Sequence, residues 1–253
     1  MLVAALSEAG FEGFEEGEGF LKAFIPAAAF DEEAVKAIAA QQQAGFTQSV
    51  IGETNWNAVW ESNFEPVVVD DFVGLRADFH PPVTGVEQEI VITPKMSFGT
   101  GHHATTYQMI GQMRDIDFTG KSVFDFGTGT GVLAILAERL GAATIQAVDN
   151  DDWSIANTTE NLERNQCSRV MVEKAETVPA HTQFDIILAN INKNVILENM
   201  QSLAAQLAPG GTLLLSGLLV EDEADILTAA SSRSLKLNRK TERNGWICLR
   251  INH

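Results

Sequence analysis

Three glycines at alternate positions, Gly127, Gly129 and Gly131, form the most chemically informative pattern in this sequence of 253 residues. They follow an apolar run, 122–126, and precede an amphipathic stretch, 131–140, so they predict a turn from a strand into a helix. Glycine lets the backbone approach a ligand closely, and the free N–H groups that begin a helix bind polar or anionic atoms. The pattern indicates a nucleotide-like ligand; the alternative is a turn that only connects the two elements tightly.

Asp149 follows at the end of the next predicted strand, 144–148. A carboxylate about 20 residues after the glycines lies at the carboxyl edge of a parallel sheet, where it can accept hydrogen bonds from both hydroxyls of a ribose. The alternative is that Asp149 and Asp151 cap the helix after this strand, and that role suits Asp151 better. We therefore expect Asp149 to bind a ribose.

The spacing of the glycines separates two classes of cofactor. Dinucleotide-binding turns follow G-x-G-x-x-G, whereas this chain has G-x-G-x-G, with Asp125 two residues before the first glycine. A carboxylate there would repel a pyrophosphate, but it can meet the amino group of a methionine moiety through bridging hydrogen bonds. The pattern favours S-adenosylmethionine over a nicotinamide dinucleotide.

Asn190 ends the predicted strand 184–189, at the edge of the sheet where reacting atoms are expected. Its side-chain carbonyl can orient an amine. The alternative is that it caps a turn, and capping suits Asn192 better.

Adjacent His102 and His103 lie in a segment, 93–106, that is too rich in glycine and hydroxyl side chains to be core. This segment leads into a predicted helix at 105–114. Neighbouring side chains diverge, and no set of Cys or carboxylate ligands accompanies the two histidines, so we predict no metal site.

The elements that position these residues alternate in type from residue 88 onward. Short apolar runs separated by amphipathic stretches predict a parallel sheet with helices on both faces, an α/β fold. The predicted strands are 122–126, 144–148, 170–173, 184–189 and 212–216, and the predicted helices between most of them are 131–140, 152–165 and 193–207. The last two segments, 235–243 and 246–251, flank Asn244-Gly245, a strong hairpin signal, so the sheet should finish with an antiparallel strand.

Residues 1–62 have the pattern of a small α+β domain in which Asp31 begins a helix as its N-cap. The other predicted elements are a helix at 2–10, strands at 20–25 and 46–51 with no strand ahead of the first, and a short helix at 55–64 with aromatic residues on one face. Prolines punctuate 63–86, which we interpret as a linker, and the larger domain covers 87–253.

The composition is that of a globular protein, 45% hydrophobic and 20% charged, and no apolar run approaches the roughly 18 to 20 residues that span a bilayer. Seventeen Lys and Arg against 34 Asp and Glu give a net charge of −17. This charge disfavours direct binding of nucleic acid and would attract a basic protein; the alternative is that it only keeps the chain soluble. Two cysteines and no secretory signal pattern suit the cytoplasm, where we expect a monomer.

Three segments together resemble a known family, that of the ribosomal protein L11 methyltransferases (PrmA). They are PKMSFGTGHHATT at 94–106, DFGTGTG at 125–131 and LANI at 188–191. The first is much more specific than the glycine pattern, which many methyltransferases share, and the resemblance spans essentially the whole chain. It implies a class I methyltransferase with a doubly wound, seven-stranded sheet whose last strand is antiparallel, and S-adenosylmethionine as cofactor.

The same resemblance implies an activity and a division of labour. One active site would trimethylate several amines of the basic ribosomal protein, including lysine side chains and the N-terminal amine. The small N-terminal domain would recognise that protein, and a flexible linker would reposition the catalytic domain. Asn190 would orient the nitrogen lone pair of the amine, while residues 98–102 close over the cofactor; no general base is predicted.

The resemblance also assigns residues. The cofactor contacts fall on Thr106, Gly127, Asp149 and Asn190, with Phe98, Gly99 and Gly129 as neighbours of the bound cofactor. Two departures from the family are visible: threonines stand at 128 and 130, where it often has Cys or Ser, and the first strand of the N-terminal domain is not recognised. The alternatives are a class I methyltransferase for another protein or a small molecule, and a non-catalytic module that binds a basic ribosomal protein.

Overall fold

The computed structural model describes residues 2–17, 19–50, 64–95, 98–178 and 182–253. The chain forms two compact units, Met1–Trp56 and Asn57–His253, and each is described by itself. The helix predicted at 55–64 lies outside the described residues except for its last one. Within the described ranges, no helix is long and apolar enough to cross a membrane.

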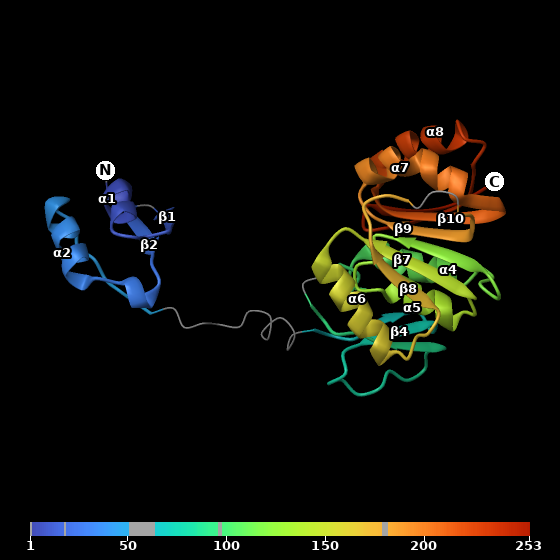
Figure 1. The fold of residues 1–253 in the computed structure, drawn as a ribbon, viewed down its shortest axis with the longest axis horizontal. Coiled ribbons are helices and arrows are strands. Elements are labelled where there is room, and N and C mark those ends of the chain that lie inside the picture. The colour runs from blue at the N-terminus through green and yellow to red at the C-terminus, as the bar shows by residue number, and fades with distance from the viewer. Residues whose placement is uncertain (1, 18, 51–63, 96–97, 179–181) are drawn as a thin grey trace. The chain divides into compact units, whose positions relative to one another are not determined.

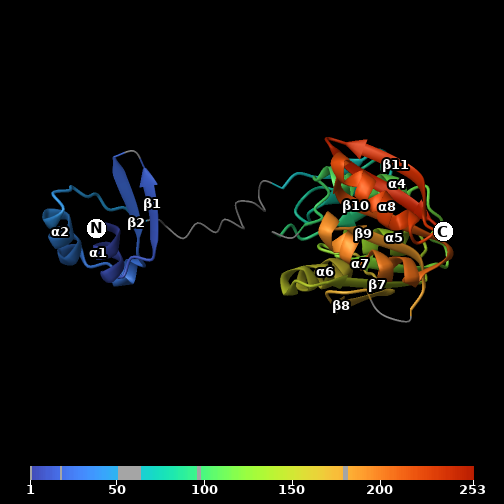
Figure 2. The same cartoon turned by 90° about the horizontal axis from the view of Figure 1, so that it is seen from above.

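The first unit contains two helices and a two-stranded antiparallel sheet (Figures 1 and 2). Its elements are α1 (Leu2–Glu8), β1 (Gly13–Gly17), β2 (Phe20–Phe24), a 3-10 turn at Ala27–Ala29, and α2 (Glu32–Gln41). The buried side chains of Leu6, Phe11 and Val35 form its small core. As predicted, Asp31 caps α2 by accepting hydrogen bonds from the backbone N–H groups of residues 33 and 34, at 3.0 and 3.1 Å.

Two expectations for this unit were wrong. β1 was not predicted, because its sequence, Gly-Phe-Glu-Glu-Gly, carries one apolar residue and becomes a strand only by pairing with β2. The strand expected at 46–51 is not present over 46–50, where the chain is exposed and outside any strand. A short run with apolar residues does not make a strand without a neighbouring strand to complete its hydrogen bonds.

The second unit is built on a seven-stranded sheet with the order β11-β12-β10-β9-β6-β7-β8. Its strands are β6 (Ser122–Phe126), β7 (Thr144–Asp149), β8 (Val170–Lys174), β9 (Phe184–Asn190), β10 (Leu207–Leu219), β11 (Lys236–Arg243) and β12 (Trp246–Asn252). β6 to β10 are parallel to one another, and β12 runs antiparallel to β10. The predicted α/β fold class, with its closing hairpin at Asn244-Gly245, is confirmed.

Helices cover both faces of this sheet because its strands are apolar on both sides (Figures 1 and 2). The helices are α4 (Ala104–Met113), α5 (Val132–Arg139), α6 (Asp152–Arg164), α7 (Lys193–Gln206) and α8 (Glu223–Ser231). In β6, Val123 packs in the core shared with α4, α5 and α6, whereas Phe124 and Phe126 pack in the core shared with α7 and α8. This alternation leaves the carboxyl ends of the strands free to form a site.

A three-stranded sheet of β3 (Val67–Val69), β4 (Val73–Arg76) and β5 (Gln88–Val91) packs into the same core as α4 and α5. β3 and β4 fall within the region that we interpreted as a linker, 63–86. Val69, Phe72 and Leu75 are almost fully buried there, so these strands belong to the second unit. β5 then leads through residues 93–103 into α4.

Candidate functional site

A cavity of about 310 Å³ opens where the carboxyl ends of β6, β7, β8 and β9 meet. A second, much smaller cavity of about 10 Å³ shares three of its lining residues, Phe98, Gly127 and Asn190. This is the edge of an open α/β sheet at which ligands bind, next to the point where the strand order reverses at β6.

The predicted site residues gather here with one exception. Seven of the eight line one or both cavities: Phe98, Gly99, Thr106, Gly127, Gly129, Asp149 and Asn190. Asp125 lines neither. The sequence reasoning missed Asn150, Ala175 and Glu176, which also line the larger cavity. Their one signal was position, since they directly follow the carboxyl ends of β7 and β8.

Asp149 and Asp151 have separate roles at the end of β7. Asp149 accepts hydrogen bonds from the backbone N–H groups of Gly129, at 3.0 Å, and of Asp151, at 3.1 Å. Its carboxylate is thus oriented beside the cavity by the glycine turn. Asp151 instead caps α6 by accepting from the backbone and hydroxyl of Ser154, both at 3.0 Å, and these bonds lower the pKa of its carboxyl. The capping role predicted for Asp151 is confirmed.

The segment that contains Phe98 and Gly99 is hydrogen-bonded to the glycine turn. The backbone N–H of Thr130 donates to the carbonyl of Phe98 at 3.0 Å, and the Thr130 hydroxyl donates to the carbonyl of Gly99 at 2.8 Å. A Cβ atom at Gly129 would lie 2.4 Å from the Phe98 carbonyl oxygen, so only glycine permits this approach. The side chain of Phe98 remains 52% exposed at the rim of the cavity.

Asn190 is 9% exposed and donates from Nδ2 to the hydroxyl of the fully buried Thr106, at 3.3 Å. Its other polar atom, Oδ1, is buried and has no hydrogen-bond partner among the described residues. A buried acceptor without a donor is costly, so a site of this kind is suited to a ligand that brings an N–H or O–H group. Asn192, by contrast, caps α7 through the N–H of Val195, as predicted.

Asp125 is fully buried and accepts a hydrogen bond of 2.7 Å from the hydroxyl of Thr128. Burial, opposed by this bond and reinforced by the nearby charge of Asp149, raises the pKa of Asp125 to about 7. Thr128 lines the smaller cavity. Asp125 therefore supports the turn from behind, and its predicted contact with a cofactor stays a prediction.

His102 and His103 hold local structure. His103 caps α4 by accepting from the backbone N–H of Thr105, and His102 lies 3.2 Å from the hydroxyl of Thr100. Among the residues that the structure describes, no three His, Cys, Asp or Glu side chains gather as metal ligands.

Residues 9–253 match the family model described as ribosomal protein L11 methyltransferase (PrmA). A curated relative with that name from Porphyromonas gingivalis is 40% identical over 99% of this chain and 89% of its own length. Another from Chlorobaculum tepidum is 42% identical over 88% of this chain and 81% of its own. The chain belongs to the ribosomal protein L11 methyltransferase family. The resemblance stated from the three segments is confirmed.

Solved structures agree with this assignment. The ribosomal protein L11 methylase from Lactobacillus delbrueckii subsp. bulgaricus aligns with a TM-score of 0.69 and 26% identity, over 74% of this chain and 98% of that one. The 16S rRNA N2 G1207 methyltransferase from T. thermophilus, solved with AdoMet and guanosine, aligns with a TM-score of 0.54 over 64% of this chain and 46% of that one. At 19% identity, the second likeness shows the fold alone. The fold, like the family, is that of S-adenosylmethionine-dependent methyltransferases, which confirms the predicted class of enzyme and its cofactor.

Proposed function

We propose that this chain transfers methyl groups from S-adenosylmethionine to lysine side chains and the N-terminal amine of ribosomal protein L11. The observation that carries the proposal is that Asn190 lines the same cavity as Asp149, while its buried Oδ1 has no hydrogen-bond partner among the described residues. Asn190 Oδ1 is suited to accept from an incoming N–H group, and the Asp149 carboxylate is suited to the hydroxyls of a ribose.

The residues present fit the cofactor. Asp149 would bind the ribose, the backbone at Gly127 and Gly129 would lie against the nucleoside, and Thr106 would support Asn190. When bound, S-adenosylmethionine supplies a methyl group on a positively charged sulfur, which a neutral amine can displace. The cavity of about 310 Å³ lies at the lower end of the range for small-molecule sites.

The chain contributes orientation and the exclusion of water. Asn190 Oδ1 accepts an N–H from the substrate amine, which turns the nitrogen lone pair toward the methyl group. Phe98, at the rim, covers the reacting atoms with an apolar ring. A lysine amine has a pKa near 10.4 in water; its removal from water in the cavity lowers that pKa, whereas the carboxylates that line the cavity raise it. The proton leaves to water or to a neighbouring carbonyl, and we assign no side chain as a general base.

In our proposal, the first unit recognises the ribosomal protein, and the flexible linker that the family resemblance implies lets the catalytic unit be repositioned. The acidity of the first unit supports this role. This unit carries nine Asp and Glu against two Lys within residues 1–56. The whole chain, at −17, would repel the phosphates of RNA. We therefore propose that the enzyme acts in the cytoplasm as a monomer on the free basic protein, without direct contact with nucleic acid or membranes.

Two carboxylates offer a matched test. Asp149→Asn and Asp151→Asn change residues two positions apart, one of which lines the cavity while the other caps α6. With radiolabelled S-adenosylmethionine and purified L11, Asp149→Asn should lower transfer about 100-fold through lost cofactor binding, a loss typical of two hydrogen bonds to a charged group. Asp151→Asn should retain activity, because Asn also caps helices well.

No transfer by the unmodified protein to L11 would overturn the proposal. Transfer to another protein in a ribosomal mixture would keep the enzyme class and correct the substrate. If L11 were bound but never labelled, the chain would be a non-catalytic binding module instead.

A further inference from the structure

α6 carries polar residues on a face that is buried in the second unit. Asn157, Thr158 and Asn161 are fully buried there. Burial of such groups is unfavourable unless they are hydrogen-bonded. Their hydrogen-bond partners therefore matter, and two of these residues, Thr158 and Asn161, bond to the backbone of the glycine turn.

Thr158 donates its hydroxyl to the carbonyl of Gly129 at 2.8 Å, and Asn161 donates from Nδ2 to the carbonyl of Thr130, also at 2.8 Å. Asn161 also accepts, through Oδ1, the backbone N–H of Thr93 at 2.7 Å. One buried amide thus joins the glycine turn to the segment that leaves β5. In sequence these partners lie 31 and 68 positions away from it.

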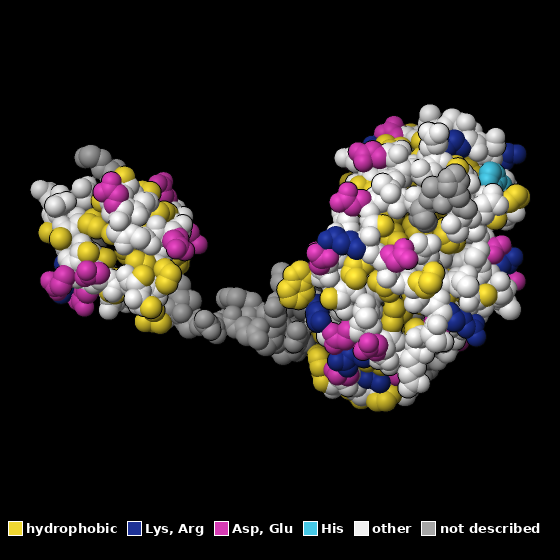
Figure 3. Space-filling model, viewed as in Figure 1, with side chains coloured by type: hydrophobic (Ala, Val, Ile, Leu, Met, Phe, Trp, Pro, Cys, Tyr) yellow, Lys and Arg dark blue, Asp and Glu magenta, His cyan; other side chains and the backbone are white. Residues whose placement is uncertain are grey.

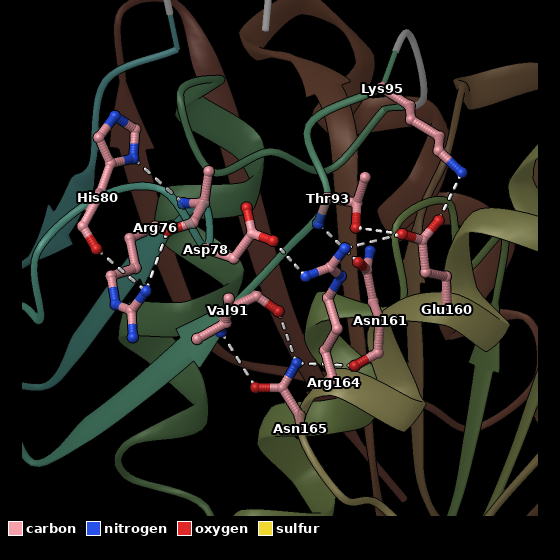
Figure 4. A network of polar contacts seen from close by, with 11 residues as sticks. Arg76, Asp78, His80, Val91, Thr93, Lys95, Glu160, Asn161, Arg164 and Asn165 are labelled. Atoms are coloured by element: carbon pink, nitrogen blue, oxygen red, sulfur yellow. Dashed lines mark hydrogen bonds and ion pairs between the residues drawn. The ribbon is translucent and has the colours of Figure 1, made fainter. Parts of the chain in front are cut away.

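The neighbouring residue strengthens the same attachment. Glu160 accepts from the hydroxyl of Thr93 at 2.7 Å and forms an ion pair with Lys95 at 2.6 Å (Figure 4). The Lys95 ammonium is the main reason that the pKa of Glu160 falls to about 2. Residues 93 and 95 are thereby held against α6, close in sequence to Phe98 and Gly99.

Phe98 and Gly99 are in turn bonded to Thr130, the residue whose carbonyl Asn161 holds. Asn161 lines neither of the two cavities described above, so it touches the site only through these partners. Asn161 holds the glycine turn at Thr130 and the segment that begins at Thr93 next to each other.

We propose that Asn161 is a positioning residue, supported by the Glu160–Lys95 ion pair, that sets how closely Phe98 and Gly99 approach the cofactor side of the glycine turn. This inference rests on the proposed function, since it takes the cavity to be the cofactor site. Loss of the Asn161 amide would let the Thr130–Phe98 hydrogen bond open and would loosen the cavity wall without removing a contact to the ligand.

Asn165, the C-cap of α6 four positions after Asn161, provides a matched control. It bonds to the last residue of β5, through the N–H and carbonyl of Val91 at 3.0 and 2.6 Å (Figure 4). It makes no bond to the glycine turn among those recorded for the described residues. Asn165 also donates to the carbonyl of Asn161 and accepts from Arg139. Each of the two alanine variants removes an amide that joins α6 to the region of β5, and only Asn161→Ala removes a side-chain bond to Thr130.

The direct readout is hydrogen exchange of the Thr130 amide in the ligand-free protein, measured relative to the amide of Gly127, which bonds to Val148. In Asn161→Ala, exchange at Thr130 should rise about tenfold over this reference, as expected for one lost hydrogen bond. Calorimetry with S-adenosylhomocysteine should show affinity weakened by about the same factor. Asn165→Ala should change neither the relative exchange at Thr130 nor the affinity for S-adenosylhomocysteine by more than about twofold.

Equal effects of the two variants on Thr130 would overturn the inference and leave Asn161 a structural residue. If Asn161→Ala does not fold, Lys95→Met keeps the test decisive, because it removes only a partly exposed ion pair. Exchange at Thr130 should then rise about threefold, with Lys174→Met, which removes the pair to Asp152 at the start of α6, as control. Failure of the unmodified protein to bind S-adenosylhomocysteine would contradict the proposed function, while the exchange of Thr130 would still decide the role of Asn161.

Discussion

At the scale of single residues, the site depends on groups whose surroundings allow little change. Gly129 lies against the Phe98 carbonyl, and Asp125 is enclosed behind Thr128. At Gly129 there is no space for a larger side chain, and at Asp125 the carboxyl is removed from water. These two restrictions predict different responses to substitution.

Gly129→Ala should destabilise the second unit much more than Gly210→Ala. Both glycines have positive φ, +58° and +75°, so alanine costs about 1 kcal/mol or more in either place. At Gly210, apart from its chain neighbours, no atom of the described residues lies within 4 Å of the new Cβ, whereas at Gly129 the clash with Phe98 should add roughly 2 kcal/mol. Urea unfolding followed by tryptophan fluorescence, to which Trp153 and Trp246 of the second unit contribute, measures the difference. Equal losses would show that Phe98 moves away freely.

Asp125 should make the second unit less stable as the pH rises. Its pKa is raised from 3.8 to about 7 in the folded protein, so the folded state binds more protons than the unfolded state between these values, and stability falls from about pH 4 to pH 7. Asp125→Asn removes this dependence. Its stability relative to the unmodified protein should increase by roughly 2 to 3 kcal/mol between pH 5 and pH 8.

Urea midpoints of both proteins at pH 5 and pH 8 provide this measurement. A difference that stays constant with pH would mean that the Asp125 carboxyl is charged in the folded protein and solvated more than its burial indicates.

At the scale of elements, buried polar side chains on helices determine how the sheet is completed. On α4, Gln108 and Gln112 are almost fully buried and donate to the carbonyls of Trp246 and Cys248 in β12, at 3.1 and 3.0 Å. α6 does the same for the glycine turn. The helices of this unit therefore position strand ends and turns through hydrogen bonds, in addition to covering the sheet.

Gln112→Ala should lower the free energy of unfolding by about 2 kcal/mol, because it leaves a cavity and removes the donors to Cys248 and Thr241. Gln201→Ala, on the exposed side of α7, should change it by less than about 0.5 kcal/mol. Urea unfolding of both variants tests this expectation. Similar small effects would show that β12 is held by its strand neighbours alone.

At the scale of the whole molecule, the two main features are the acidic net charge and the division of the chain into two units. Each unit has its own buried core. Asp and Glu side chains are visible at several places on the surface of the first unit (Figure 3). Such a charge distribution speeds the encounter with a basic protein at low ionic strength.

Association with L11 should slow about tenfold between 50 and 500 mM salt, because salt screens the attraction between the acidic chain and its basic partner. Stopped-flow measurement of the association rate tests this expectation. Binding of S-adenosylhomocysteine serves as the control and should change by less than about twofold. An association rate independent of salt would mean that the acidity serves solubility and not recognition.

The sequence alone determined the family, the fold class and most of the candidate site. The glycine turn, Asp149 and Asn190 follow apolar strand patterns, and the carboxyl ends of parallel strands must meet at one edge, so their proximity could be predicted. The helix caps at Asp31, Asp151 and Asn192 were equally legible, since a cap bonds within three residues of itself.

Only the tertiary structure decided which polar groups are buried and what holds them. β1 exists because β2 pairs with it, and 46–50 has no strand despite its pattern. Asp125 is enclosed behind its turn, and Asn161 joins segments 31 and 68 positions away. Local patterns report periodicity and hydropathy within a segment, whereas these hydrogen bonds and burials depend on distant parts of the chain that are brought together only by packing.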